Sequence, residues 1–410
     1  MYGERPAKYT ETNMSRFEEL KKRDSDLICN TYGRYPVAIE RARDCRVWDF
    51  DGKEYVDLLA GIAVTSVGHC NEEIAEVMEK QARKLVHVSN LFYQEEQIEL
   101  AERILKTNHC GKVFFCNSGA EANEGAFKLA RRYNQRVKEN GRFEIISFTS
   151  CFHGRTLATV AATGQAKFQD GFSPMPAGFI QVPMGDLEAL RKVISWNTAA
   201  VIMEMVQGEG GVMPVDEAFV KAAYALCREK GVLFIADEVQ AGLCRTGRWW
   251  GFQHYGIEPD IVTSAKALAN GLPMGAVMAT DEIAKGFEPG THATTFGAGA
   301  FVSSVASKTL EIMERDNLAG RAAELGAWAM DRFRQIGEKV PGTIEMVRGR
   351  GLFIGIVLTA PGKTVWEKLI QRGFLLNLTQ DTVLRLLPPL TITKEDLEAF
   401  AVALEEVLQE

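Results

Sequence analysis

The 410-residue sequence lacks the features that mark membrane, secreted or nucleic-acid-binding proteins. No apolar run approaches the length of a membrane span, and the first ten residues lack the charged start and apolar core of a signal peptide. Basic residues are not in excess, because the net charge is −7 and no long Lys/Arg run occurs. This charge argues against nucleic acid or an anionic membrane as a partner. We therefore expect a protein that stays in the cytoplasm.

Sequence patterns for disulfides, metals and two classes of nucleotide are also missing. The eight cysteines form no CxxC pair and have no matched histidine spacing, which predicts reduced thiols and neither a disulfide framework nor a metal site. The chain has no GxGxxG and no GxxxxGK[ST], so a nicotinamide or ATP enzyme is poorly supported. Its 46% hydrophobic and 25% charged content is typical of a globular protein large enough for two or three domains, or for one large core with a satellite.

Two apolar runs each end in a reactive side chain. Residues 232–236 read as a strand buried on both faces of a parallel sheet, and Asp237 follows them. Residues 260–265 read as a second strand that leads to Lys266. Ligands of open α/β sheets bind beyond the carboxyl ends of the strands, where both groups would lie. Pyridoxal phosphate needs an amine for its aldehyde and a carboxylate for its pyridinium proton. An Asp that caps a helix and a solvated Lys are the alternative for either residue alone.

Two further strands also end in residues suited to that cofactor. Residues 112–116 lead into Ser118-Gly119-Ala120 at the start of a helix, where free backbone N–H groups favour a phosphate dianion. An ordinary helix cap is the alternative. Residues 143–148 lead to Phe152 and Arg155. An aromatic ring there can stack on a planar cofactor, and a guanidinium can bind a substrate carboxylate, although a core Phe and a solvated Arg are equally compatible with the sequence.

Charged residues also occur in two other apolar segments. Residues 201–206 read as a strand with an inward-facing carboxylate at Glu204, followed by the glycine-rich residues 207–211. Glycines permit close approach of the backbone to a ligand. Arg385 lies in the apolar residues 383–390, and a buried guanidinium needs an anion, either from the protein or from a substrate.

Hydrophobic periodicity predicts an α/β protein of more than one domain. From about residue 95 to 285, apolar runs alternate with amphipathic helical patterns, which predicts βαβ units and a mostly parallel sheet. Residues 41–59 have the alternation of a β-hairpin around Asp51-Gly52. After Ser303 the pattern predicts an α+β lobe that starts with one long helix at about 305–336. The expected division is 1–65 for an N-terminal arm and part of a small domain, 66–302 for the large domain and 303–410 for the C-terminal small domain.

Five short blocks carry a family resemblance when they are taken together and in order. They are NSGAEAN at 117, FHGR at 152, QGEGG at 207, ADEVQ at 236 and SAKALANG at 264. With these blocks the chain resembles class III aminotransferases of the fold-type-I pyridoxal-phosphate superfamily, most closely the acetylornithine aminotransferases, from about residue 30 to the end. The resemblance implies a large domain with a mostly parallel seven-stranded sheet, a small α+β domain, bound pyridoxal phosphate and a homodimer with active sites at its interface.

The resemblance also implies a role for each matching residue that would contact the cofactor ring. Lys266 resembles the lysine that forms the Schiff base and moves a proton between the substrate Cα and the cofactor. Asp237 would hold the pyridinium proton, and Gln240 would bond to the phenolic oxygen. Phe152 and Val239 would pack on the two faces of the ring.

The remaining matches are to phosphate-binding and substrate-binding residues. The phosphate would be held by Ser118, Gly119 and Ala120, together with Thr295 from the other subunit. Arg155 resembles the residue that binds the substrate α-carboxylate. Glu209 and Arg385 match a switch pair, in which the arginine binds the γ-carboxylate of glutamate in one half-reaction and is neutralised by Glu209 in the other.

The implied reaction transfers an amino group between N²-acetylornithine and 2-oxoglutarate, giving N-acetylglutamate 5-semialdehyde and glutamate, a step of arginine biosynthesis. Ornithine, succinylornithine, succinyldiaminopimelate and 4-aminobutyrate aminotransferases are alternatives, because one or two pocket side chains, at ~1–3 kcal/mol each, separate them. An alternative from a different functional class is a regulatory protein that binds the cofactor but has no catalytic activity. The chain departs from the family at Met205, where relatives usually carry Pro, and at residues 298–300, where many show Gly-Asn-Pro.

Overall fold

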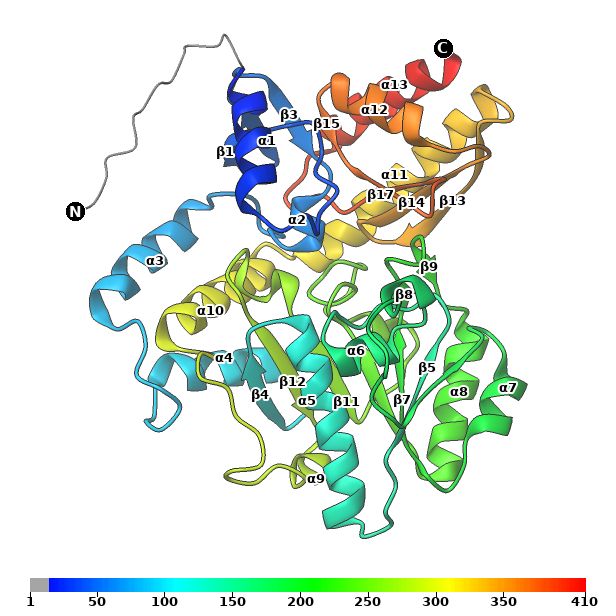
Figure 1. Cartoon of the computed structure of the whole chain (residues 1–410). Helices are drawn as coiled ribbons and strands as arrows, with labels where there is room; N and C mark the ends of the chain where they lie inside the picture. Colours follow the sequence, from blue (N-terminus) through cyan, green and yellow to red (C-terminus); the bar gives the residue numbers. More distant parts are fainter. Residues whose placement is uncertain (1–14) are drawn as a thin grey trace, which may run out of the picture.

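A computed structural model describes residues 15–410 of the chain (Figure 1). A seven-stranded sheet with its helices occupies the lower half of the view, and two four-stranded sheets occupy the upper half. The seven strands, in spatial order, are β4 (Lys112–Cys116), β12 (Gly275–Ala279), β11 (Ile261–Ser264), β10 (Leu233–Asp237), β7 (Thr198–Glu204), β5 (Glu144–Phe148) and β6 (Phe179–Val182). Six of the seven strands run in the same direction and β12 runs opposite to them, so the prediction of a mostly parallel seven-stranded sheet is confirmed.

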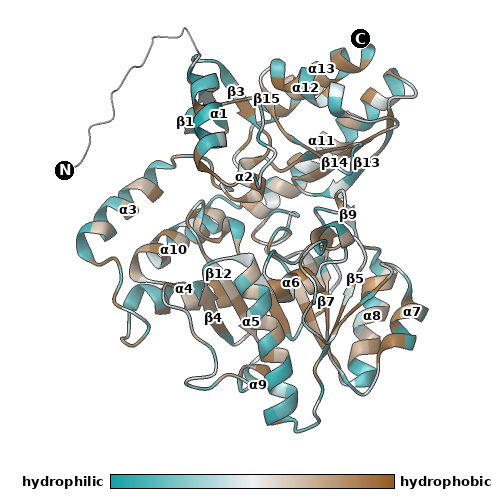
Figure 2. Cartoon of the chain, viewed as in Figure 1, coloured by the Kyte–Doolittle hydropathy of each residue, from teal (hydrophilic) through white to brown (hydrophobic). Residues whose placement is uncertain are grey.

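The central strand β10 shows why this sheet forms. Each of its five residues is buried, so both faces of the sheet are covered. Because side chains alternate along a strand, Phe234 and Ala236 pack into one hydrophobic core, while Leu233 and Ile235 pack into a second core on the opposite face. Figure 2 shows the hydrophobic strands between more hydrophilic helices.

Helices with recognisable caps connect and cover the strands. The helices are α1 (Arg16–Leu27), α2 (Ala60–Ala63), α3 (Glu72–Lys84), α4 (Glu95–Leu105), α5 (Gly119–Arg132), α6 (Leu157–Ala162), α7 (Leu187–Val193), α8 (Glu217–Lys230), α9 (Asp281–Ala284), α10 (Ala300–Arg315), α11 (Leu318–Lys339), α12 (Lys363–Gln371) and α13 (Lys394–Gln409). In α8, for example, the Asp216 side chain accepts a hydrogen bond from the Phe219 N–H at the start, and Gly231 ends the helix with φ +61°. None of the helices in residues 15–410 is long and apolar enough to cross a membrane.

The upper half combines both ends of the chain. One sheet has the order β1 (Ile39–Arg43), β2 (Arg46–Asp49), β3 (Glu54–Asp57) and β15 (Phe374–Leu375), and the other has the order β13 (Ile344–Arg350), β14 (Phe353–Leu358), β17 (Val383–Leu386) and β16 (Asn377–Thr379). A short pair, β8 (Val206–Gln207) and β9 (Met213–Pro214), completes the strands. The hairpin predicted around Asp51-Gly52 is confirmed by the antiparallel pairing of β2 with β3. The boundaries predicted at residues 65/66 and 302/303 stay a prediction.

The single long helix predicted at about 305–336 is wrong. The structure has two helices there, because α10 ends at Arg315 and α11 begins at Leu318. Asn317 takes a left-handed conformation, with φ +46°, and its side chain accepts a hydrogen bond from the Gly320 N–H at 3.3 Å. Asparagine adopts this conformation more readily than most residues and caps helices well, so it ends one helix and starts the next.

Candidate active site

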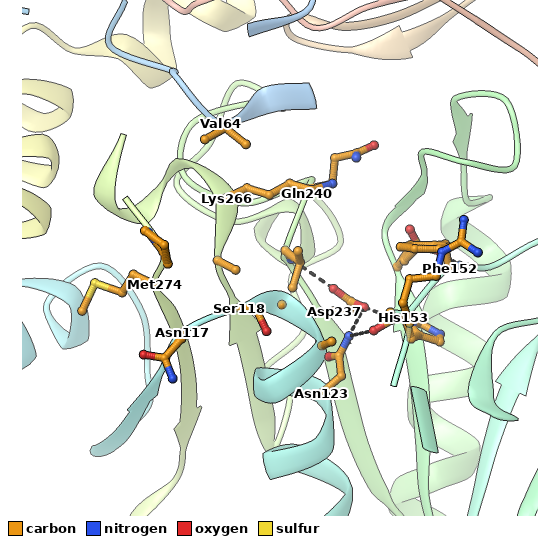
Figure 3. A pocket seen from close by; sticks show the side chains of 18 of the residues that line it. Val64, Asn117, Ser118, Asn123, Phe152, His153, Asp237, Gln240, Lys266 and Met274 are labelled. Carbon is orange, nitrogen blue, oxygen red and sulfur yellow. Dashed lines mark hydrogen bonds and ion pairs between the residues drawn. The ribbon is translucent and has the colours of Figure 1, made fainter. Parts of the chain in front are cut away.

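A cavity of 420 Å³ lies at the carboxyl ends of the central strands (Figure 3). The residues after β4, β5 and β11, and the last residues of β7 and β10, all contribute to its wall. Ten of the twelve predicted site residues line it: Ser118, Gly119, Ala120, Phe152, Arg155, Glu209, Asp237, Val239, Gln240 and Lys266. Parallel strands bring residues far apart in sequence to one edge of a sheet, which explains why these segments meet.

The other two predicted residues do not line the cavity of this chain. Arg385 is 1% exposed on β17 and reaches the cavity wall through an ion pair with Glu209. Thr295 is exposed to solvent. Its position leaves it available to a second subunit, as the resemblance implies, and its role stays a prediction.

A hydrogen-bond network holds the carboxylate of Asp237, which is 3% exposed at the end of β10. Its Oδ2 accepts hydrogen bonds from Asn123 Nδ2 at 2.8 Å and from the His153 ring at 2.7 Å, and its Oδ1 accepts from the Val239 N–H at 3.0 Å. Thr263 Oγ1 in turn donates to Asn123 Oδ1 at 2.8 Å, which fixes the orientation of the amide. A carboxylate offers about four acceptor positions, so Oδ1 retains one for a ligand.

Lys266 follows β11 and has both an unusual backbone and a shifted pKa. Its φ is +42°, in the left-handed region that non-glycine residues seldom adopt, and such strain is concentrated at functional sites. Burial lowers the pKa of Lys266 to about 8, a shift that the positive charge of Arg385 reinforces and the negative charges of Glu209 and Asp237 oppose. At pH 7 about a tenth of this amine is therefore unprotonated and nucleophilic, far more than for a lysine with an ordinary pKa.

The N-terminus of helix α5 forms another part of the cavity wall. Ser118 caps the helix, and its Oγ accepts a hydrogen bond from the Glu121 N–H at 3.1 Å. A Cβ on Gly119 would lie 2.7 Å from Val239 Cγ1, so only glycine fits at this close approach. The first N–H groups of the helix and its dipole favour an anion at this end.

An ion pair lies at another part of the cavity wall. Arg385 Nη1 donates to Glu209 Oε1 at 2.6 Å, and the two side chains are 2% and 30% exposed. Burial by itself would raise the pKa of Glu209, but the charge and hydrogen bond of Arg385 outweigh it and lower that pKa. Glu209 is therefore the anion that the buried guanidinium of Arg385 was expected to need.

Three residues of this site had no assigned role in the sequence analysis. Asn123 and His153 lie within the NSGAEAN and FHGR blocks, and both bond to Asp237. Glu204, already notable as an inward-facing carboxylate, accepts a hydrogen bond from the Phe152 N–H at 2.9 Å, and burial raises its pKa to about 8. In the sequence, these three residues stand out only as polar residues inside otherwise apolar or small-residue blocks. That pattern does not identify their hydrogen-bond partners.

Comparison with known proteins decides the family. The class III aminotransferase family matches residues 28–408. The chain belongs to the class III aminotransferases. It is 47% identical to the acetylornithine aminotransferase of Methanocaldococcus jannaschii, over 92% of this chain and 95% of that protein, and 44% identical to the enzyme of the same name from Myxococcus xanthus, over 90% and 93%.

Solved structures of aminotransferases have the same fold. The ornithine aminotransferase of Toxoplasma gondii ME49 superposes with a TM-score of 0.92 at 33% identity, covering 97% of this chain and 96% of that chain. The acetylornithine aminotransferase of Elizabethkingia anophelis superposes with a TM-score of 0.86 at 32% identity, covering 97% of this chain and 100% of that chain. The predicted fold-type-I architecture of this aminotransferase is thus confirmed.

The cofactor of this family is pyridoxal phosphate, and the cavity of this aminotransferase fits it. Among residues 15–410, the buried atoms Gln240 Oε1 and His153 Nε2 have no hydrogen-bond partner, and Gln240 lies on the cavity wall. The free acceptor position of Asp237 suits a pyridinium N–H, and the N-terminus of α5 suits a phosphate. When bound, pyridoxal phosphate supplies an electron sink for a carbanion at the substrate carbon that bears the transferred amino group.

Proposed function

We propose that this aminotransferase transfers the amino group of N²-acetylornithine to 2-oxoglutarate, giving N-acetylglutamate 5-semialdehyde and glutamate. The proposal is supported by relatives at 47% and 44% identity that are acetylornithine aminotransferases. The structural observation that carries it is an arginine on the cavity wall, Arg155, which has no ion-pair partner among residues 15–410, while Glu209 on the same wall neutralises a second arginine, Arg385. Such a pocket accepts a substrate with a single carboxylate, and release of Glu209 adapts it to a dicarboxylate.

The reaction chemistry is assigned to residues at the strand ends. Lys266 attaches the cofactor and then, as a free amine, moves a proton between the cofactor and the substrate carbon that bears the transferred amino group, which is Cδ in N²-acetylornithine and Cα in glutamate. Its lowered pKa supports this role, because a general base works best when its pKa lies near the working pH. Asp237, oriented by Asn123 and His153, keeps the proton on the ring nitrogen. Gln240 bonds to the phenolic oxygen.

Binding roles are assigned to the other residues of the cavity. Phe152 and Val239 contact the two faces of the cofactor ring, and Ser118, Gly119 and Ala120 hold its phosphate. Arg155 binds one carboxylate of the substrate in each half-reaction. The fork of five N–H donors on arginine suits a carboxylate in two-point contact.

Substitution of Glu209 tests the switch pair. In Glu209→Ala, Arg385 has no anion when the acetylornithine side chain occupies the pocket, but it still has one when glutamate does. The ratio of kcat/KM for acetylornithine to kcat/KM for glutamate should therefore fall by about 10-fold. Steady-state kinetics with each donor measures this ratio, and Glu217→Ala on the exposed surface of α8 is the matched control. An unchanged ratio contradicts the switch assignment.

A homodimer with its active sites at the interface is part of the proposal. Leu91, Phe92 and Tyr93 are 86%, 66% and 99% exposed, and Phe296, which follows Thr295, is 67% exposed. Asn90 Nδ2 donates to the carbonyl of Gly297 at 3.1 Å, so the two loops form one apolar patch. Contiguous exposed apolar residues mark interaction surfaces. A second subunit bound to this patch would lie next to Thr295, which agrees with the proposal that Thr295 contacts the phosphate of the other subunit.

A cytoplasmic location also belongs to the proposal. All eight cysteines lie in the described part of the chain, and none forms a disulfide. Six of them are buried, and burial raises the pKa of Cys110, for example, to about 12. Unreactive free thiols suit a reducing compartment.

The absorption spectrum of the purified protein tests the function as a whole. We expect the yellow colour of bound pyridoxal phosphate, and its loss when N²-acetylornithine is added without any oxo acid, because the amino group then stays on the cofactor. Ornithine and 4-aminobutyrate added in parallel serve as controls for the substrate. Loss of colour with one of these, but not with acetylornithine, overturns the substrate assignment, and a protein that never becomes yellow overturns the cofactor roles.

A further inference from the structure

Arg155 at the cavity wall is held by an aromatic ring. The side chain is exposed, and within residues 15–410 it has no ion-pair partner. Its guanidinium carbon lies 4.0 Å from the centroid of the Phe168 ring, and 5.5 Å from that of Phe152. The nearest strong interaction of this cation is therefore with Phe168, a residue that does not line the cavity and has no part in the proposed function.

Phe168 is itself firmly placed. It ends a short 3-10 turn, η2 (Ala166–Phe168), and is half-buried. Its ring meets Phe152 edge to face, with centroids 5.6 Å apart and planes at 81°. Two flanking glutamines anchor the turn to the loop that carries Arg155 and to the helix after it. Gln165 Nε2 donates to the Cys151 carbonyl at 3.1 Å, and Gln169 Nε2 donates to the Val160 carbonyl at 3.2 Å.

Such a ring restricts the side-chain conformations of an arginine that has no carboxylate partner. Its long side chain has many rotamers, and each substrate that binds must restrict them. A planar guanidinium above an aromatic face is attracted by the ring quadrupole, and its N–H donors at the edge stay available to a carboxylate. Positioning before the substrate arrives favours binding, because less freedom is lost in the complex.

We propose that Phe168 is a positioning residue, which holds the Arg155 guanidinium in the orientation that binds the substrate carboxylate. The inference rests on the proposed function, since it needs Arg155 to bind that carboxylate. It adds an aromatic residue outside the cavity to the determinants of substrate affinity. The alternative is that Phe168 only supports Phe152, in which case it would influence the cofactor and not the substrate.

The variant Phe168→Leu separates these roles, because leucine keeps the apolar packing and removes the aromatic face. We expect KM for N²-acetylornithine and for 2-oxoglutarate to rise about threefold to thirtyfold, the range of a cation–π contact, with kcat within about twofold of the native value. Phe168→Tyr, which keeps the face, should behave like the native enzyme. Phe172→Leu is the matched control, a phenylalanine four residues away that is 61% exposed.

Direct binding and a double-mutant cycle complete the test. Calorimetry measures the Kd of 2-oxoglutarate for the holoenzyme that carries pyridoxal phosphate, in which this acid has no amino group to accept. Arg155→Ala should weaken binding, and adding Phe168→Leu to it should have no further effect, because the ring acts through the arginine. An equal loss in both backgrounds, or an altered cofactor spectrum with unchanged Kd, overturns the inference.

The same cycle tests the role of Phe168 separately from the role of Arg155. If Arg155→Ala weakens binding and Phe168→Leu does not, only the positioning role of Phe168 is wrong. If Arg155→Ala leaves the Kd unchanged, the carboxylate role of Arg155 in the proposed function is wrong, and the role of Phe168 falls with it.

Discussion

The variant Lys266→Ala should have a kcat lower than that of the native enzyme by about 10⁴-fold or more, the upper range for a general acid–base residue. Two functions are lost together, since the amine that attaches the cofactor is also the base that removes the proton from the substrate carbon bearing the transferred amino group. The lowered pKa of Lys266 and its place on the cavity wall suit it to both. Single-turnover kinetics with N²-acetylornithine, starting from enzyme loaded with pyridoxal phosphate, measures the proton-transfer step apart from product release.

A small added amine provides the control for this variant. Methylamine or ethylamine can enter the space that the lysine side chain leaves, so activity should rise with the concentration of the unprotonated amine. Lys285→Ala, which removes a lysine paired with Glu282 at the surface, should leave kcat unchanged. Cofactor can still bind to Lys266→Ala through its phosphate. Substantial turnover without added amine would show that another group is the base.

The variant Asp237→Ala should have a kcat at least about 100-fold lower than the native value, because a charge-assisted hydrogen bond of about 1.5–3 kcal/mol and the protonation of the ring nitrogen are lost together. It should also unfold more easily. Asn123 and His153 lose their common acceptor in a buried site, which costs about 1–3 kcal/mol for an unsatisfied group. Steady-state kinetics and denaturant unfolding of the cofactor-free protein measure the two effects separately.

A cofactor analogue methylated on the ring nitrogen distinguishes the chemical role of Asp237 from a structural role. Its nitrogen carries a permanent positive charge and needs no carboxylate to keep a proton, and the shortened side chain leaves room for the methyl group. Activity of Asp237→Ala should therefore recover in part with this analogue, whereas the native enzyme should work worse with it. If the variant folds, binds the analogue and stays inactive, the carboxylate does more than protonate the ring.

Local patterns in the sequence were sufficient to predict the main strands of the sheet and to place the reactive residues at the ends of these strands. The apolar run before Asp237 and the one before Lys266 form β10 and β11, and both residues line the cavity. Strand periodicity and short blocks are local properties, which a sequence displays directly. The break at Asn317 was missed, since the apolar pattern on both sides of it continues and only the left-handed backbone of this residue divides the helix.

What the sequence by itself determined is which chemical groups this protein has and at which edge of the sheet they gather, because parallel strands place their carboxyl ends together. Only the tertiary structure decided how those groups act on one another. Asp237 meets His153 across 84 positions, and Glu209 meets Arg385 across 176. The lowered pKa of Lys266 depends on burial by segments from the whole chain. Hydrogen bonds and desolvation depend on distances of a few ångströms, which periodicity does not specify.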